Sequence, residues 1–162
     1  MLDASTIRRA EQVLALCREA GIKVATVESC TGGMIAGVLT ACAGSSDVVE
    51  RGFITYSNEA KQDTLGVSLE TLGTKGAVSE KVAREMAEGA RLKHGADYAL
   101  ATTGIAGPAG GTEGKPVGTV FITLATRQGT QVLKECNHTD RETFKMVTTQ
   151  QALNLLRQAI ED

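Results

Sequence analysis

The segment KVATVESCTGGMIAGVLTA, residues 23–41, predicts a strand, a sharp turn and a helix in immediate succession. Residues 23–28, KVATVE, form a short run rich in β-branched side chains, which favours a strand. From Thr31 to Ala41 the residues are small or apolar, which suits a helix packed close to a sheet. A strand that passes at once into such a helix is typical of α/β proteins.

Helices and strands also alternate on either side of this segment. Apolar residues recur at helical spacing over residues 7–17, and Gly21 follows where a glycine ends a helix. Downstream, residues 51–56 (RGFITY) predict a strand, residues 58–65 a short helix and residues 68–72 a further turn.

The second half of the chain continues the alternation. Ser79 is a suitable N-cap for an amphipathic helix that ends near His94. Residues 97–103 (DYALATT) predict a buried strand, and residues 117–126 (VGTVFITLAT) form the longest β-branched run of the sequence. Residues 131–138 are the predicted hairpin partner of that run.

A last helix completes the order of elements. Thr139 and Glu142 have the spacing of a capping box, and apolar residues recur at helical spacing from Phe144 to Ile160. Strands that alternate with helices place helices on both faces of a sheet, and the late hairpin adds an antiparallel pair. We therefore predict one domain over residues 1–162, a three-layer α/β/α sandwich with a mixed sheet.

Composition and charge exclude several classes of protein. Apolar residues make up 42% of the 162 residues, enough for one hydrophobic core. The formal net charge of -2 and the 3% of aromatic residues argue against a nucleic-acid partner, which would need a basic surface or stacking platforms. Charged residues throughout positions 1–20 argue against a signal peptide or membrane span, so we expect a cytoplasmic protein with no membrane partner.

Cysteines and histidines give no sign of a disulfide or a metal site. The four cysteines are Cys17, Cys30, Cys42 and Cys136. They contain no C-x-x-C pair, and a cytoplasmic location keeps such thiols reduced. His94 and His138 do not lie at ligand spacing from a cysteine or from each other. We therefore expect free thiols and no metal.

A loop rich in glycine and proline follows the predicted strand at residues 97–103. The segment GIAGPAGGTEGKPVG, residues 104–118, holds both prolines and is neither a Walker A loop nor a G-x-G-x-x-G motif. Clustered glycines let backbone N–H groups approach a ligand, and ligands of open α/β sheets bind beyond the carboxyl ends of strands. The loop therefore predicts an anion or nucleotide site, although its composition also fits a long flexible hairpin loop.

Two further segments carry residue types suited to chemistry. In ESCTGG, residues 28–33, a helix N-terminus with free N–H groups follows the strand, which suits an oxyanion or phosphate and equally suits a structural N-cap. Cys30 is either a nucleophile activated by the helix terminus or a buried, inert thiol. Ser45 and Ser46 precede Lys61, and serine with a desolvated lysine is chemically sufficient for amide hydrolysis.

Five motifs taken together resemble the CinA C-terminal domain family. They are ESCTGG (28–33), GSS (44–46), GFITYSNEAK (52–61), GAVS (76–79) and TGIAGPAGGTEGKPVGTV (103–120). The likeness covers nearly the whole chain. It implies an α/β/α homo-oligomer, with a dimer favoured, that uses no cofactor. It also implies conversion of nicotinamide mononucleotide to nicotinic acid mononucleotide and ammonia in pyridine nucleotide recycling.

The same resemblance implies roles for individual residues. Ser46 is expected to be the nucleophile, Lys61 its general base, and Tyr56 the hydroxyl that positions or relays the proton between them. The residues expected to line the nucleotide pocket are Ser29, Thr31, Gly32, Thr103, Gly104, Gly107, Gly110 and Gly111. Arg141 is expected to clamp the phosphate bidentately. From the residues alone, Ser29, Ser45 and Ser46 stay open as nucleophiles.

Two rival functions use the same features. A non-catalytic nucleotide-binding module would keep the pocket and serve as a sensor or an assembly part. A hydrolase dependent on Cys30 would act on another amide. Turnover of nicotinamide mononucleotide excludes the first, and insensitivity to thiol alkylation excludes the second.

Overall fold

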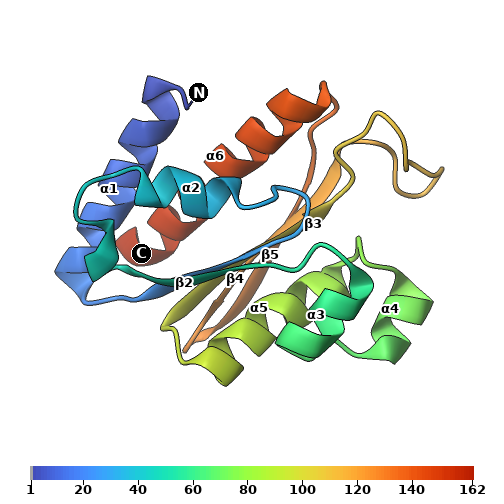
Figure 1. The fold of residues 1–162 in the computed structure, drawn as a ribbon, viewed down its shortest axis with the longest axis horizontal. Helices are drawn as coiled ribbons and strands as arrows, with labels where there is room; N and C mark the ends of the chain where they lie inside the picture. Colours follow the sequence, from blue (N-terminus) through green and yellow to red (C-terminus); the bar gives the residue numbers. More distant parts are fainter. Residues whose placement is uncertain (1) are drawn as a thin grey trace.

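Five strands form one mixed sheet between two layers of helices in the computed structural model, which describes residues 2–162 (Figure 1). The strands are β1 (Val24–Glu28), β2 (Val49–Ile54), β3 (Tyr98–Gly104), β4 (Thr119–Thr126) and β5 (Gly129–Cys136). The α-helices are α1 (Ala4–Ala20), α2 (Met34–Thr40), α3 (Asn58–Leu65), α4 (Leu69–Lys75), α5 (Glu80–His94) and α6 (Arg141–Glu161), and a short 3-10 helix, η1, covers Ser45–Asp47. The predicted α/β/α fold is confirmed.

The strand order β2-β1-β3-β4-β5 places the carboxyl ends of three parallel strands at one edge of the sheet. β1 pairs in parallel with β2 and with β3, whereas β4 and β5 extend the sheet by antiparallel pairing. The connection from β1 leads to β2 on one side, and the connection from β3 leads to β4 on the other. Such a switch in direction opens a crevice beyond the strand ends, which is the usual ligand site of an open α/β sheet.

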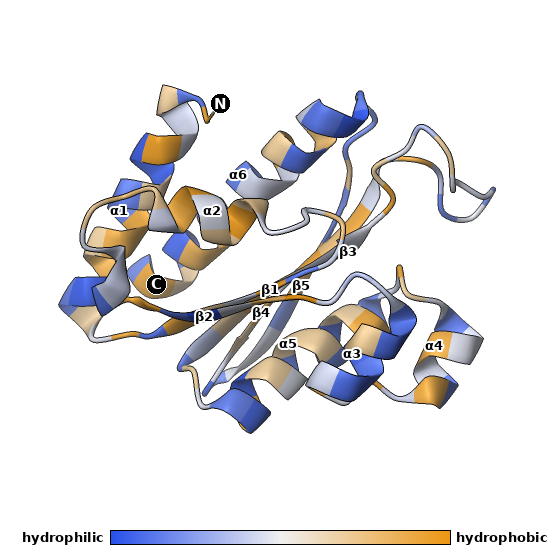
Figure 2. Cartoon of the chain, viewed as in Figure 1, coloured by the Kyte–Doolittle hydropathy of each residue, from blue (hydrophilic) through white to orange (hydrophobic). Residues whose placement is uncertain are grey.

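The two helical layers cover the two faces of the sheet (Figure 1). α1, α2 and α6 pack on one face, where the larger apolar cluster includes Leu14, Leu100 and Phe144. α3, α4 and α5 pack on the other face, where the second cluster includes Val27 and Met86. The helices of both layers are striped by hydrophobic and hydrophilic residues, as expected for helices with one side on a sheet and the other in water (Figure 2).

A close approach between α3 and α5 fixes the helix that carries Lys61. A side-chain carbon added at Gly89 in α5 would lie 1.9 Å from the carbonyl oxygen of Leu65, the last residue of α3. Only a glycine fits here, because real side-chain carbons do not come so close to a backbone oxygen. The end of α3 is therefore seated directly on the backbone of α5.

Most predicted elements are confirmed, and the differences are one helix where a turn was expected and the ends of some elements. The turn expected at residues 68–72 is the start of the helix α4, capped by the Ser68 side chain. The final helix is capped by Asp140, whose carboxylate accepts from the Thr143 N–H, so Thr139 does not cap it. Within residues 2–162, no helix is both long and apolar enough to cross a membrane.

Candidate active site

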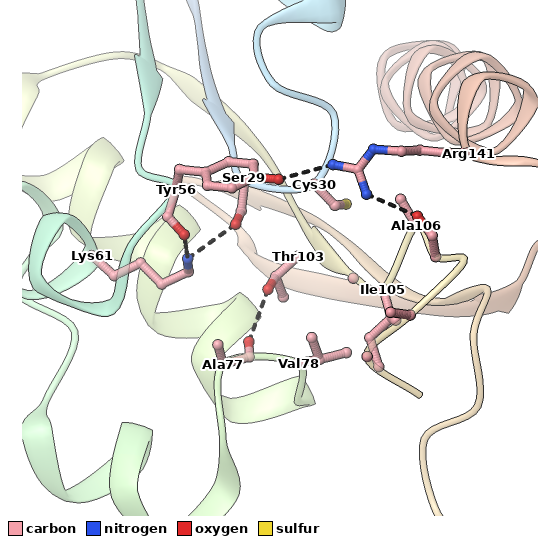
Figure 3. A pocket seen from close by; sticks show the side chains of 14 residues that line it. Ser29, Cys30, Tyr56, Lys61, Ala77, Val78, Thr103, Ile105, Ala106 and Arg141 are labelled. Carbon is pink, nitrogen blue, oxygen red and sulfur yellow. Dashed lines mark hydrogen bonds between the residues drawn. The ribbon is translucent and has the colours of Figure 1, made fainter. Parts of the chain in front are cut away.

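A pocket of about 280 Å³ lies where β1, β2 and β3 end (Figure 3). Its walls come from the residues after β1 and β2, the segment before α5, the glycine-rich loop after β3 and the first residue of α6. The lining residues are Ser29, Cys30, Tyr56, Lys61, Ala77, Val78, Thr103, Gly104, Ile105, Ala106, Gly107, Ala109, Gly110 and Arg141. Segments far apart in the sequence thus meet at one edge of the sheet.

Ser29 and Lys61 are in direct contact inside this pocket. Ser29 is the first residue after β1, and Lys61 lies in the first turn of α3, which follows β2. The Nζ of Lys61 lies 3.0 Å from the Oγ of Ser29, and the Lys61 side chain is 1% exposed (Figure 3). A hydroxyl that lines the pocket is therefore in contact with an almost fully buried amine.

Two backbone carbonyls orient the amine of Lys61. Its Nζ donates to the oxygen of Thr55 at 2.8 Å and to the oxygen of Tyr56 at 3.1 Å. Burial lowers the pKa of the Lys61 amine, because the charged form loses hydration. A neutral amine has two hydrogens, and the two carbonyls can only accept. Its lone pair is then left for the hydroxyl hydrogen of Ser29, which is the arrangement that a general base needs.

The turn after Ser29 presents free backbone donors. Within the described residues, the N–H groups of Cys30 and Thr31 have no backbone acceptor, so they are available to donate to a ligand.

The thiol of Cys30 is a separate question. The Cys30 side chain lines the pocket, but burial raises the pKa of its thiol to about 12. The buried, inert interpretation of Cys30 is the one that this environment supports.

Arg141 closes the other side of the pocket. One guanidinium nitrogen donates to the oxygen of Gly107 at 2.9 Å, and the other donates to the hydroxyl of Tyr56 at 3.1 Å (Figure 3). Tyr56 is 61% exposed, and its hydroxyl points to Arg141 and not to the Ser29–Lys61 pair. The structure therefore does not place this hydroxyl between serine and lysine, and its expected role of positioning or relaying the proton stays a prediction. Ser29 and Lys61 touch directly and need no relay.

Ser46 does not meet Lys61. It is exposed in η1, before the first residue of β2, whereas Lys61 follows the last residue of that strand. A strand of this length spans about 20 Å. The neighbouring Asp47 is held at the far end of the sheet, where its backbone oxygen accepts from Lys23. The expected pairing of Ser46 with Lys61 is thus not found within one chain, and Ser29 is the serine in contact with that amine.

Three residues expected at the pocket lie outside its lining. The Thr31 side chain is fully buried, and its hydroxyl is engaged by Glu28 and Thr102, so that hydroxyl does not reach a ligand. Gly32 faces the amine of Lys145. Gly111 packs on the backbone of Val117, where an added side-chain carbon would come within 2.8 Å of the nitrogen.

The other predicted residues do line the pocket: Ser29, Tyr56, Lys61, Thr103, Gly104, Gly107, Gly110 and Arg141. Sequence reasoning missed the apolar wall made by Ala77, Val78, Ile105 and Ala106. The Thr103 hydroxyl donates to the oxygen of Ala77 at 2.8 Å and holds part of this wall against β3. A signal was present, because these residues lie within the GAVS and TGIAGPAG motifs.

Comparison with known sequences connects this geometry to a family. Residues 7–160 match the CinA C-terminal domain. The chain is 49% identical over 159 residues to the nicotinamide-nucleotide amidohydrolase PncC of Escherichia coli strain K12, which covers 98% of this chain and 96% of that protein. It is also 49% identical over 155 residues to a CinA-like protein of Shewanella piezotolerans, which covers 94% of this chain and 36% of that longer protein.

Solved structures share the fold. The competence/damage inducible protein CihA from Agrobacterium tumefaciens superimposes with a TM-score of 0.93 at 44% identity, over 100% of this chain and 99% of that one. A CinA superfamily protein from Escherichia coli superimposes with a TM-score of 0.87 at 35% identity, over 97% of this chain and 94% of that one.

Proposed function

Because this chain belongs to the CinA C-terminal domain family, we infer that it is a nicotinamide-nucleotide amidohydrolase. It hydrolyses the carboxamide of nicotinamide mononucleotide to nicotinic acid mononucleotide and ammonia. Two findings support this function: the near full-length likeness to the Escherichia coli amidohydrolase and the geometry of the pocket. The observation that carries it is the 3.0 Å contact between Ser29 and the buried amine of Lys61, a nucleophile in contact with its base.

The first half of the reaction forms an acyl-enzyme. The Ser29 oxygen attacks the carboxamide carbon while its proton passes to the neutral amine of Lys61. The carbonyl oxygen becomes an oxyanion, and we assign its stabilisation to the N–H of Cys30, which adjoins the nucleophile and has no backbone acceptor in the described chain. The tetrahedral intermediate collapses as Lys61 returns the proton to the departing nitrogen, and ammonia leaves.

The second half releases the acid. Lys61 is neutral again after ammonia has left, so it can remove a proton from a water molecule that attacks the ester carbon. Collapse of this second intermediate returns the proton to the Ser29 oxygen and frees the carboxylic acid product, which ionises. Each proton transfer uses the same nitrogen, because no other basic side chain of the pocket lies within hydrogen-bond distance of Ser29 in residues 2–162.

The rest of the pocket suits a nucleotide. Arg141 lines the pocket, and each of its two terminal nitrogens keeps one hydrogen beyond the one given to Gly107 or Tyr56. A guanidinium pairs with a phosphate through two parallel hydrogen bonds. Gly107 and Gly110 let the loop backbone approach the ligand, and the apolar wall at Val78 and Ile105 suits the pyridine ring. We therefore propose that Arg141 holds the phosphate while the ring carboxamide reaches Ser29.

Arg141→Ala is expected to raise KM for nicotinamide mononucleotide about 10- to 100-fold, the usual effect of losing charge-assisted hydrogen bonds, with a smaller change in kcat. Steady-state ammonia release measures both constants. Nicotinamide riboside, which lacks the phosphate, is the control substrate, and its kcat/KM should change less than that of the mononucleotide. Equal losses on both substrates would show that Arg141 does not bind the phosphate.

One assay tests the function itself. The pure protein is incubated with nicotinamide mononucleotide without added metal, and ammonia and nicotinic acid mononucleotide are measured together. Equal amounts of the two products support the amidohydrolase. Binding of the mononucleotide without turnover would favour the rival function of a non-catalytic nucleotide-binding module.

Iodoacetamide at neutral pH is expected to leave ammonia release unchanged. A thiol with a pKa of about 12 is almost entirely protonated at pH 7.5, so Cys30 should not react, whereas Cys136 is exposed. Mass spectrometry of tryptic peptides locates the label, and Cys136→Ser is the matched control that removes it. Loss of activity in step with alkylation of Cys30 would support a cysteine hydrolase instead.

Location and assembly are the remaining parts of the proposal. We propose that the protein is cytoplasmic and, from the family resemblance, that it is a homo-oligomer, with a dimer favoured. Sedimentation equilibrium of the pure protein measures the oligomeric state directly.

A further inference from the structure

Glu28 is a fully buried acidic residue beneath the catalytic turn. It is the last residue of β1, it is 0% exposed, and it forms no salt bridge within residues 2–162. A buried carboxylate without a cation must be compensated by hydrogen bonds. Glu28 lies directly before Ser29, so the hydrogen bonds of its carboxylate act on the turn that contains the proposed nucleophile.

The carboxylate of Glu28 caps the N-terminus of α2, although Glu28 precedes the N-cap position Gly33 by five residues. Gly33, at the N-cap position, has no side chain to cap the helix. One oxygen of Glu28 accepts from the N–H of Gly33 at 3.2 Å and of Ile35 at 2.9 Å, and the other accepts from the N–H of Ala36 at 3.0 Å. These are the donors that a helix leaves free at its N-terminus. Glu28 therefore ties the end of β1 to the start of α2, across the turn that Ser29 begins.

A hydroxyl relay extends this connection to β3. The Thr31 hydroxyl donates to Glu28 at 2.6 Å and lies 2.9 Å from the Thr102 hydroxyl. Because the single hydrogen of Thr31 goes to Glu28, Thr102 must be the donor of the second bond. The side chains of Glu28, Thr31 and Thr102 thus hold the turn to β3. A backbone bond adds to this connection, because the Ser29 N–H donates to the Thr102 oxygen at 3.1 Å.

The backbone of Glu28 reaches the other member of the dyad. Its carbonyl accepts from the N–H of Thr55 at 2.9 Å. The carbonyl of the same Thr55 accepts from the Lys61 amine at 2.8 Å. Glu28 therefore holds the turn that follows Ser29 through its side chain, and its carbonyl connects through Thr55 to the lysine that faces the serine.

We propose that Glu28 is a positioning residue for the hydrolysis, whose buried carboxylate holds Ser29 at the distance and angle at which Lys61 can take its proton. The inference rests on the Ser29–Lys61 chemistry proposed above. It differs from a purely structural helix cap in what it predicts, because a cap alone would change the melting temperature and leave the turnover of each folded molecule intact.

Glu28→Gln tests this role, since the amide keeps the size of the side chain but its NH2 group cannot accept from the Ala36 N–H. Misplacing a nucleophile by about 1 Å lowers rates by about 100-fold, so we expect kcat per folded molecule to fall about 10- to 100-fold. KM should change little, because Arg141 is untouched. A fluorophosphonate should label Ser29 more slowly by a similar factor. Glu70→Gln, an exposed glutamate in the first turn of α4, is the matched control.

The two readouts separate this inference from the proposed function. If the wild type releases ammonia and Glu28→Gln keeps both kcat and the labelling rate, Glu28 does not position the dyad and the function stands. If the wild type releases no ammonia, the function is wrong, and the labelling rates of Ser29 still decide the role of Glu28.

A milder pair of variants covers the case in which Glu28→Gln does not fold. Thr31→Val removes one donor to the carboxylate, whereas Thr31→Ser keeps it. We expect the valine variant to label Ser29 more slowly than the serine variant. Equal labelling rates in the two variants would overturn the proposal.

Discussion

Ser29→Ala is expected to abolish ammonia release, with kcat reduced about 10⁴-fold or more, the scale seen when a serine nucleophile is removed. The alanine variant keeps the pocket and Arg141, so binding of nicotinamide mononucleotide should persist. Acid quenching of the wild type during turnover, followed by mass spectrometry, should find the acyl group on the peptide that contains Ser29.

Ser46→Ala is the comparison that separates the two serines. Its hydroxyl lies at the opposite end of β2 from Lys61, so its loss should lower kcat far less than the loss of Ser29. If Ser46→Ala removed turnover and Ser29→Ala kept it, the assignment made from the geometry would be wrong.

Lys61→Met is expected to lower kcat/KM about 10³-fold, within the usual range for loss of a general base. The methionine fills a similar space but has no proton to exchange. Lys61→Arg should be equally inactive, because a guanidinium stays charged at any pH at which the protein folds. Circular dichroism and the melting temperature serve as controls, since both variants disturb the donors to the carbonyls of Thr55 and Tyr56.

The pH profile of the wild type tests the same residue. Only the neutral amine accepts a proton, so kcat/KM should rise with pH through the pKa of Lys61 and fall as the pH drops. Burial lowers that pKa from the ordinary lysine value of 10.5, so the rise should be complete at a lower pH than for an exposed lysine. A rate that stayed constant down to acidic pH would contradict a lysine base.

The fold could be predicted because each local pattern agrees with the others. The strand, turn and helix of residues 23–41, the strand at residues 97–103 and the late hairpin all form as expected. The differences lie where short polar segments decide an end: several capping residues follow one another near residue 140, and Asp140 is used instead of Thr139.

The proposed catalytic serine, Ser29, could not be identified from the pattern of motifs alone. Both GSS and ESCTGG place a serine near a predicted element, and the resemblance favoured the first. The position relative to the strands separates them. Ser29 follows the carboxyl end of β1 and Lys61 follows that of β2, and these parallel neighbours end at the same edge, whereas Ser46 precedes the amino end of β2. Topology is therefore the better guide to which side chains meet.

The direction of the Tyr56 hydroxyl could not be predicted. Its partner Arg141 is 85 positions away in the sequence, at the start of the last helix. The rotamer of an exposed side chain depends on neighbours that are distant in the sequence, and local sequence propensities do not identify those neighbours.

The two acceptors that aim the Lys61 amine are peptide carbonyls, those of Thr55 and Tyr56. Every amino acid supplies the same carbonyl, so the path of the main chain sets the direction of the lone pair of the Lys61 amine. A change of side chain at residue 55 or 56 should leave that direction unchanged. A substitution at residue 56 can therefore change the wall of the pocket and still leave the proposed base oriented by the same carbonyls. In this fold, reactivity and selectivity can evolve separately.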